Sequence, residues 1–349
     1  MSFKFWSKFF FYSIVSFFTL IASINYIVNP YNIFNHTLFS TFIKTHEHTV
    51  SARMTDFYTL KHTDPTNLIM GSSRVGMFNQ DIFQKYLGKN TYTLAMPGSN
   101  IEEQSQYLIF MIKNKKLKNI LWSLDFFSFN PDLPNDDGFS YNRVDSSAFE
   151  KDDYQIALFS LQTTKNSLNT LVDNIELLFS GQEPKDDKLL LRESIDRYLT
   201  LSPEDIDKRT RIQLQYYPEK FLKFATFNKP ESIQENLLKV KKIIDLCEEK
   251  NINLILYTSP VQKSFLDLYQ TLGLGETFHS WKKELTKITD YTDFCTYNSV
   301  TDNPYNFVDG THIMPNFGEL IFAKIFHDPS VDVPSDFGTY VPKDSQRTP

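Results

Sequence analysis

The stretch NLIMGSSR at residues 67–74 is a short apolar run that ends in small and polar residues. Two later stretches have the same design, YTLAMPGSN at residues 92–100 and NILWSLD at residues 119–125. Helical patterns follow the first two, at about residues 79–87 and 101–114. Short apolar strands that alternate with helices predict an α/β fold whose parallel sheet is covered by helices on both faces.

The alternation is interrupted at residues 131–229 and then returns. Helical spacing begins again at Ser232, a strand is expected at residues 254–257, and a weaker one around residues 293–296. The interrupting segment carries helical patterns and a charged stretch, so we interpret it as a largely helical insertion that covers one end of the sheet. A last helix is expected at about residues 315–326.

These patterns divide the chain into four parts. We expect a cytoplasmic N-terminus and membrane anchor at residues 1–30, a connecting segment at 31–65, and an α/β domain at 66–329 that contains the insertion. Residues 330–349 form a tail rich in Pro, Asp and Ser, which we expect to be loosely held.

The N-terminal segment has the length and composition of a membrane span. Residues 9–28 carry no charge, and about 20 residues at 1.5 Å each cross a hydrocarbon core of ~30 Å. Lys4 and Lys8 precede this run and no lysine directly follows it. This pattern predicts a single-pass anchor in the cytoplasmic (inner) membrane, with the bulk of the chain on the extracytoplasmic, periplasmic side. A cleaved signal peptide, which also exports the protein, and a buried core helix are the alternatives.

The composition disfavours several functional classes. The 349 residues carry 36 basic and 42 acidic side chains, a net charge of −6, which disfavours a nucleic-acid partner. The sequence has no GxGxxG, P-loop or HExxH pattern, so we expect neither a nucleotide cofactor nor a metal. His46 and His48 lack a third nearby ligand and are interpreted as part of a polar connection. For Cys247 and Cys295 we favour two separate buried thiols, with a disulfide as the alternative.

Residues suited to acyl chemistry follow the predicted strands. Ser73 lies on the turn after the first strand, where its hydroxyl reaches the sheet edge and its N–H can face an oxyanion. Gly98, after the second strand, can offer another N–H. Asp309 precedes His312 by three residues, so it can orient the imidazole that accepts a serine proton. Because the carboxyl ends of the strands form one edge of an open α/β sheet, we expect these residues to meet there.

This arrangement resembles the SGNH/GDSL hydrolase superfamily. In that family a serine follows the first strand, a glycine the second and a polar residue the third, and Asp-x-x-His lies near the C-terminus. The matching residues here are Ser73, Gly98, Asp125, Asp309 and His312. The resemblance covers about residues 66–130 and 232–326. It implies a flavodoxin-like three-layer α/β/α sandwich and serine acyl chemistry by Ser73, His312 and Asp309.

Two positions depart from the family pattern. Ser72 stands where the family has an aspartate. Asp125 stands where the family usually has an asparagine whose amide donates to the oxyanion, and an ionised carboxylate cannot donate. Asn100 is a candidate to supply the missing amide. Arg74, next to the serine, is a candidate either to bind an anionic substrate group or to form a structural salt bridge.

The anchor and the Gly-Ser-Ser sequence are similar to a membrane-anchored subgroup that includes the DltD-like and alginate O-acetylation proteins. This resemblance implies an esterase or O-acyltransferase, most of all for acetyl groups, that acts on a cell-envelope polysaccharide or glycan. It also implies a multi-span membrane O-acyltransferase as partner. Water as acceptor gives an esterase and a sugar hydroxyl gives a transferase, and the residues leave both open. The alternatives are an inactive accessory or binding protein, which Asp125 favours, and a membrane-surface lipase.

Overall fold

The structure is a computed structural model that describes residues 3–36, 52–145, 150–180, 195–222 and 226–344. These residues belong to two units, one from residues 1–63 and 137–190 and the other from residues 64–136 and 191–349. The predicted insertion is therefore divided. Its residues 137–190 belong with the N-terminal part of the chain, and its remaining residues belong with the sheet.

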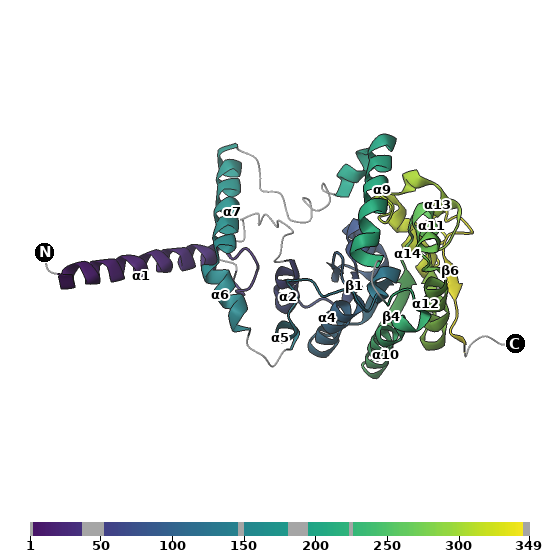
Figure 1. Ribbon diagram of the computed structural model, residues 1–349, viewed down its shortest axis with the longest axis horizontal. Coiled ribbons are helices and arrows are strands. Elements are labelled where there is room, and N and C mark those ends of the chain that lie inside the picture. The colour runs from purple at the N-terminus through teal and green to yellow at the C-terminus, as the bar shows by residue number, and fades with distance from the viewer. Residues whose placement is uncertain (1–2, 37–51, 146–149, 181–194, 223–225, 345–349) are drawn as a thin grey trace. The chain divides into compact units, whose positions relative to one another are not determined.

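A mostly parallel sheet forms the centre of the second unit (Figure 1). Among the described residues it has six strands in the order β2-β1-β3-β4-β5-β6. The strands are β1 (Asn67–Gly71), β2 (Thr91–Ala95), β3 (Asn119–Leu124), β4 (Asn253–Thr258), β5 (Tyr291–Asp293) and β6 (Thr339–Val341). β1 to β5 pair in parallel, which confirms the predicted α/β class, whereas β6 pairs with β5 in antiparallel orientation.

Helices cover both faces of this sheet. The α-helices of the unit are α3 (Gln80–Leu87), α4 (Ile101–Asn114), α9 (Pro203–Tyr217), α10 (Gln234–Glu249), α11 (Lys263–Thr271), α12 (Gly275–Ile288), α13 (Ser299–Asp302) and α14 (Gly318–Phe326). Ile69 of β1 packs in a cluster with Phe83 of α3 and Phe322 of α14. Trp122 of β3 pairs with Met70, the neighbour of Ile69, so its side chain points to the opposite face of the sheet. There its indole N–H donates to Gln104 of α4 at 2.7 Å.

Short 3₁₀ and π turns shape the loops at the ends of the strands. They are η1 (Ser73–Met77), η2 (Phe126–Phe129), η3 (Arg197–Thr200), the π-helical η4 (Pro218–Leu222), η5 (Pro230–Ile233), η6 (Pro304–Asn306) and η7 (Pro315–Phe317). η1 and η2 directly follow β1 and β3, so tight turns, and not long loops, leave the carboxyl ends of these strands.

The C-terminal tail differs from its prediction. Its described part, residues 330–344, is held to the rest of the unit, because β6 extends the sheet beyond β5. Phe337, just before β6, is fully buried, and its ring centroid lies 4.9 Å from that of Phe294. One aromatic anchor thus holds a segment whose polar composition predicts no stable element.

The first unit contains α1 (Phe3–Val28), α2 (Ala52–His62), α5 (Tyr141–Val144), α6 (Lys151–Phe159) and α7 (Leu161–Ser180). α1 is long and apolar enough for a membrane span or a signal sequence. The connecting segment expected at residues 31–65 includes α2, a feature that the sequence prediction missed. His46 and His48 lie outside the described residues.

Both cysteines are free thiols, and both are buried. This finding agrees with the favoured interpretation of two separate thiols. Burial raises the pKa of Cys247 and of Cys295 to about 12 in each case. Neither thiol is therefore a reactive thiolate at neutral pH.

We predict that Phe337→Ala releases β6 and lowers the free energy of unfolding by about 3–5 kcal/mol, the usual cost of truncating a buried phenylalanine. Urea unfolding of the full chain in detergent measures the loss. The control is Tyr340→Phe in β6, where the ring is exposed and only a surface hydrogen bond to Asp290 is removed. Equal losses in the two variants would contradict the anchoring role of Phe337.

Candidate active site

The loops after β1, β2 and β3 meet at the carboxyl edge of the sheet. Gly71 pairs with Ala95, and Met70 pairs with Trp122, so the three strands end next to one another. Ser73 therefore begins its turn beside the Pro97–Asn100 loop and beside Asp125, which directly follows β3. The parallel register thus brings three of the sequence-predicted segments together.

Ser73 opens the turn η1 directly after β1. The preceding Gly71 leaves no room for a side chain, since a Cβ there would lie 2.7 Å from Val75 Cγ1 and 2.9 Å from Ser123 Cβ. Ser72 caps the turn, because its hydroxyl oxygen accepts from the N–H of Arg74 at 3.4 Å. Ser73 itself is partly exposed, whereas Ser72 and Arg74 are buried. Of these three side chains, Ser73 is the one that solvent or a substrate can reach.

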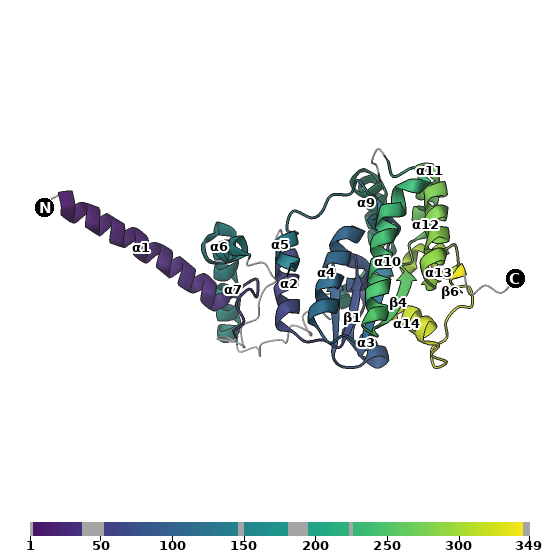
Figure 2. The same ribbon diagram turned by 90° about the horizontal axis from the view of Figure 1, so that it is seen from below.

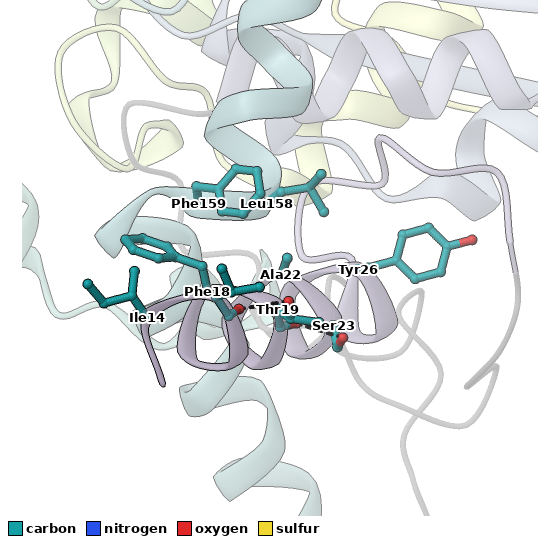
Figure 3. Close-up of a pocket in the computed structure, with 9 residues that line it drawn as sticks. Ile14, Phe18, Thr19, Ala22, Ser23, Tyr26, Leu158 and Phe159 are labelled. Carbon is teal, nitrogen blue, oxygen red and sulfur yellow. Dashed lines mark hydrogen bonds between the residues drawn. The ribbon is translucent and has the colours of Figure 1, made fainter. Parts of the chain in front are cut away.

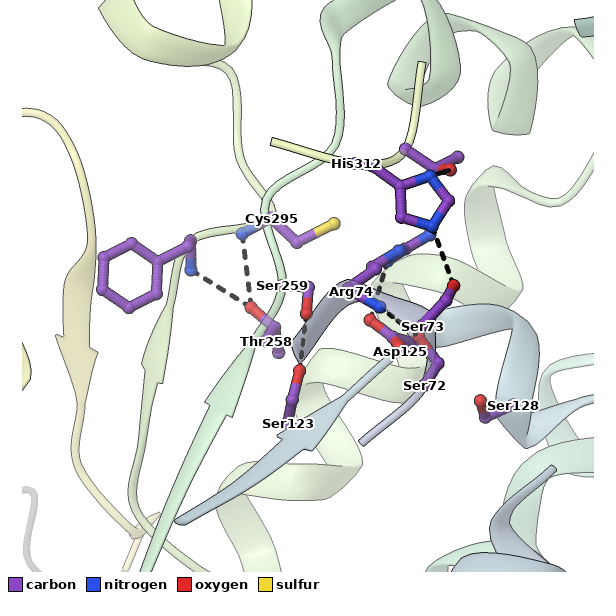
Figure 4. A network of polar contacts seen from close by, with 12 residues as sticks. Ser72, Ser73, Arg74, Ser123, Asp125, Ser128, Thr258, Ser259, Cys295 and His312 are labelled. Atoms are coloured by element: carbon purple, nitrogen blue, oxygen red, sulfur yellow. Dashed lines mark hydrogen bonds and ion pairs between the residues drawn. The ribbon is translucent and has the colours of Figure 1, made fainter. Parts of the chain in front are cut away.

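The hydroxyl of Ser73 lies 2.8 Å from Nε2 of His312 (Figure 4). On the other side of the ring, His312 Nδ1 lies 2.9 Å from Asp309 Oδ2 and 3.0 Å from Oδ1. The carboxylate accepts from Nδ1–H, which leaves Nε2 as the acceptor for the Ser73 proton. The three residues predicted as a catalytic triad are therefore joined in a chain of hydrogen bonds, across 239 residues of sequence between Ser73 and His312.

Asp309 is held by its own loop. Its Oδ1 accepts from the N–H of Thr311 at 2.8 Å and from the N–H of His312 at 3.0 Å. Burial alone would raise the pKa of Asp309, but the charge and hydrogen bonds of His312, with the Thr311 N–H, lower it to about 2. Asp309 is therefore an anion over the whole neutral range and can stabilise a His312 imidazolium.

Helix α9 supplies a contact that the sequence did not reveal. Gln213 donates from Nε2 to Asp309 Oδ2 at 3.3 Å. Gln213 lies inside the segment interpreted as an insertion, and no spacing or motif links it to Asp309. Only the tertiary structure, which packs α9 next to the Asp309 loop, brings Gln213 to this carboxylate.

Arg74 and Asp125 form a buried ion pair beside Ser73 (Figure 4). Arg74 Nη1 donates to Asp125 Oδ1 at 2.7 Å, and Nη2 donates to the hydroxyl of Tyr217 on α9 at 3.2 Å. The guanidinium also lies 5.6 Å from the ring centroid of Phe127. Burial opposes the charge of Arg74, but the carboxylate of Asp125 raises its pKa above the usual range.

This pair decides between the alternatives for two residues that the sequence singled out. Arg74 is 5% exposed and forms the structural salt bridge that the sequence left open, so it is not free to bind an anionic substrate. Asp125 is 1% exposed and its Oδ1 is bound to Arg74. Asp125 is therefore placed as the partner of a buried cation and not as a group that faces an oxyanion.

Asn100 does not supply the missing amide. Its Oδ1 accepts from the N–H of Glu103 at 2.9 Å, which caps α4. Its Nδ2 donates to the carbonyl of Leu133 and to Asn135 Oδ1, both at 2.9 Å. The two amide protons are thus used in holding the next loop, and the assignment of Asn100 to the oxyanion site is wrong.

Gly98 is better placed for that role. Its φ of +67° is a conformation that favours glycine, and a Cβ would lie 3.3 Å from the ring of Phe221. Within the described residues its N–H donates no backbone hydrogen bond. The N–H groups of Gly98 and Ser73 remain the candidate oxyanion donors at this edge of the sheet.

In the described part of the chain, no group of three or more His, Cys, Asp or Glu side chains is placed to hold a metal ion. No protein-family model matches this chain, and neither does any curated protein. The chemistry of the site is therefore inferred from its own geometry.

The pKa of Asp309 predicts a specific dependence of stability on pH. A carboxyl whose pKa falls from 3.8 unfolded to about 2 folded contributes about 2 kcal/mol above pH ~4, and this contribution disappears as the pH falls towards 2. Free energies of unfolding should therefore separate for wild type and Asp309→Asn above pH ~4 and converge below it. Parallel pH profiles would contradict the assigned hydrogen bonds.

The Arg74–Asp125 pair predicts unequal effects of single and double substitution. Asp125→Asn leaves a buried cation without its counter-charge and should cost about 3–5 kcal/mol of unfolding free energy. The double variant Arg74→Met, Asp125→Leu removes both charges and should lose less. Urea unfolding measures both, and a double variant as unstable as Asp125→Asn or more so would contradict a buried, coupled pair.

Proposed function

We propose that this protein is a serine acyl hydrolase or acyltransferase of the SGNH type. The observation that carries the proposal is the hydrogen-bond chain from Ser73 through His312 to Asp309, with 2.8 Å and 2.9 Å between the bonded atoms. Serine is a weak nucleophile unless a base takes its proton, and this geometry supplies an oriented base. The carboxyl-edge location on a mostly parallel sheet is where sites form in open α/β folds.

The proposed reaction has two steps. The Ser73 oxygen attacks the acyl carbonyl while its proton passes to His312 Nε2, and the N–H groups of Ser73 and Gly98 bind the oxyanion. His312 then gives the proton to the departing alcohol, which leaves an acyl-serine ester. An acceptor hydroxyl gives its proton to His312, attacks this ester and takes the acyl group, and Ser73 regains its proton.

The substrate class follows from the N-terminal helix together with the resemblance of the sequence. A helix suited to membrane insertion or export supports an enzyme on the extracytoplasmic side. There we propose an acyl ester, acetyl first, as donor and a cell-envelope glycan or water as acceptor, with a multi-span membrane O-acyltransferase as possible partner. The protein is anchored in the cytoplasmic membrane in this proposal.

A binding protein without catalysis is the second candidate. The observation that favours it is the absence of an amide donor at Asp125, whose carboxylate is paired with Arg74. With two backbone donors and no side-chain amide, oxyanion stabilisation is weaker by roughly 10²–10³ in rate if the third donor matters.

Covalent labelling of the full chain by a fluorophosphonate, followed by hydrolysis of p-nitrophenyl acetate, separates these candidates. We predict labelling at Ser73 and a fall in hydrolysis of roughly 10³-fold or more in both Ser73→Ala and His312→Ala. The matched control is Ser72→Ala, which removes the adjacent buried hydroxyl and should keep the label.

Labelling that persists in Ser73→Ala would contradict the proposed nucleophile. Absence of labelling in the wild-type protein would favour the binding role. If long-chain esters are hydrolysed much faster than acetyl esters, the substrate is a lipid and not an acetylated glycan.

A further inference from the structure

Helix α7 has its polarity reversed. The buried side chains that the structure describes on this helix are polar, namely Thr163, Asn166, Ser167, Thr170 and Asn174. Its exposed side chains include large apolar ones, namely Leu161, Leu168, Val172, Ile175 and Phe179. A helix on the surface of a water-soluble domain has the opposite arrangement.

The exposed apolar residues form one continuous face, called here the apolar stripe of α7. Their spacing is seven, four, three and four residues, which keeps all five on one side of an α-helix. The first and last residues of the stripe are the most exposed, with Leu161 at 88% and Phe179 at 89%. A contiguous apolar face of five large side chains is unfavourable in water and marks a surface that contacts something apolar.

The polar face of α7 has partners inside its own unit. Asn166 donates to the hydroxyl of Tyr31 at 3.1 Å, and the hydroxyl of Thr163 donates to the carbonyl of Ile156 at 2.7 Å. These contacts fix the rotation of the helix about its axis. The outward direction of the apolar stripe is therefore set by hydrogen bonds on the opposite face.

α6 and α7 are joined to the end of α1. Asn25 of α1 is fully buried, and its Nδ2 donates to the carbonyl of Leu158 and to the hydroxyl of Thr164. The rings of Phe18 and Phe159 lie 6.4 Å apart, and both side chains line an apolar groove between α1 and the end of α6 (Figure 3). The side chains of α1 are exposed from Phe3 to Leu20, and cover by the protein begins at Ile21.

The direction of α7 is as informative as its composition. α7 runs across the end of α1 and not alongside it, in both views of the unit (Figures 1 and 2). A helix that lies across a membrane-spanning helix runs along the plane of the bilayer. α7 lies at the point where the side chains of α1 change from exposed to covered by protein. This is the depth expected for the boundary between lipid and water.

We propose that α7 lies in the membrane–water interface, with the apolar stripe in the acyl-chain boundary and the polar face towards the protein. The occupant of the stripe is lipid, because the stripe begins at Leu161, two residues after Phe159, whose ring lies beside Phe18 on the exposed surface of α1. The protein then contacts the bilayer through one spanning helix and one surface helix. This inference does not depend on the proposed catalytic activity.

A local probe is needed, because α1 alone keeps the protein in a membrane. Single cysteines at Val172 and Ile175 carry a nitroxide spin label in the full chain, which is reconstituted into vesicles of phosphatidylcholine and phosphatidylglycerol. The matched control is Asn169→Cys, an exposed polar position on the same helix that lies outside the stripe. The native Cys247 and Cys295 are buried and react slowly.

We expect the labels at Val172 and Ile175 to collide often with oxygen, which concentrates in lipid, and to lose their collisions with a water-soluble nickel chelate. The label at Asn169 should show the reverse. Nickel accessibility at Val172 and Ile175 equal to that at Asn169 would place the stripe in water and overturn the proposal. Low accessibility to both reagents would also overturn it, because it would mean that a protein surface covers the stripe, either a second copy of this chain or a membrane partner.

Discussion

The buried ion pair between Arg74 and Asp125 is the constraint around which the candidate site is built. Arg74 is 5% exposed and Asp125 is 1% exposed. If the two were separated, each would be a buried charge without a partner and without contact with water. Because Arg74 directly follows Ser73 and Asp125 directly follows β3, the pair fixes the Ser73 turn to the end of the neighbouring strand. The position of the Ser73 hydroxyl opposite His312 depends on this attachment.

Helix α9 and the turn η4 complete the same site from one side. Gln213 contacts the Asp309 carboxylate, Tyr217 contacts the Arg74 guanidinium, and Phe221 packs against Gly98. These three residues come from nine consecutive positions, 213–221, of the segment that interrupts the strand–helix alternation. The interruption is therefore part of the site. Its residues lie against Asp309, Arg74 and Gly98, which are next to the proposed base, the proposed nucleophile and the proposed oxyanion site.

The two units differ in which kind of side chain they bury. In the sheet unit, apolar side chains fill the core and the charged groups that are buried are paired. On α7 of the other unit, the buried side chains that the structure describes are polar, and large apolar side chains face outward. Such a reversal is stable when the surroundings of the helix are themselves apolar. The reversed helix and the apolar α1 together make this unit suited to a bilayer.

The sequence by itself determined the α/β class, the approximate positions of β1 to β5 along the chain and the apolar N-terminal helix. It also indicated that Ser73, Asp309 and His312 lie at one edge of the sheet. It could do so because strand and helix periodicities are local and because parallel strands end together. Tertiary structure alone decided that β6 joins the sheet, that the Asn100 amide holds the loop at Leu133 and Asn135, that Arg74 pairs with Asp125, and that Gln213 reaches Asp309. These contacts depend on which distant segments are buried against one another, and no local pattern encodes the path of the chain between them.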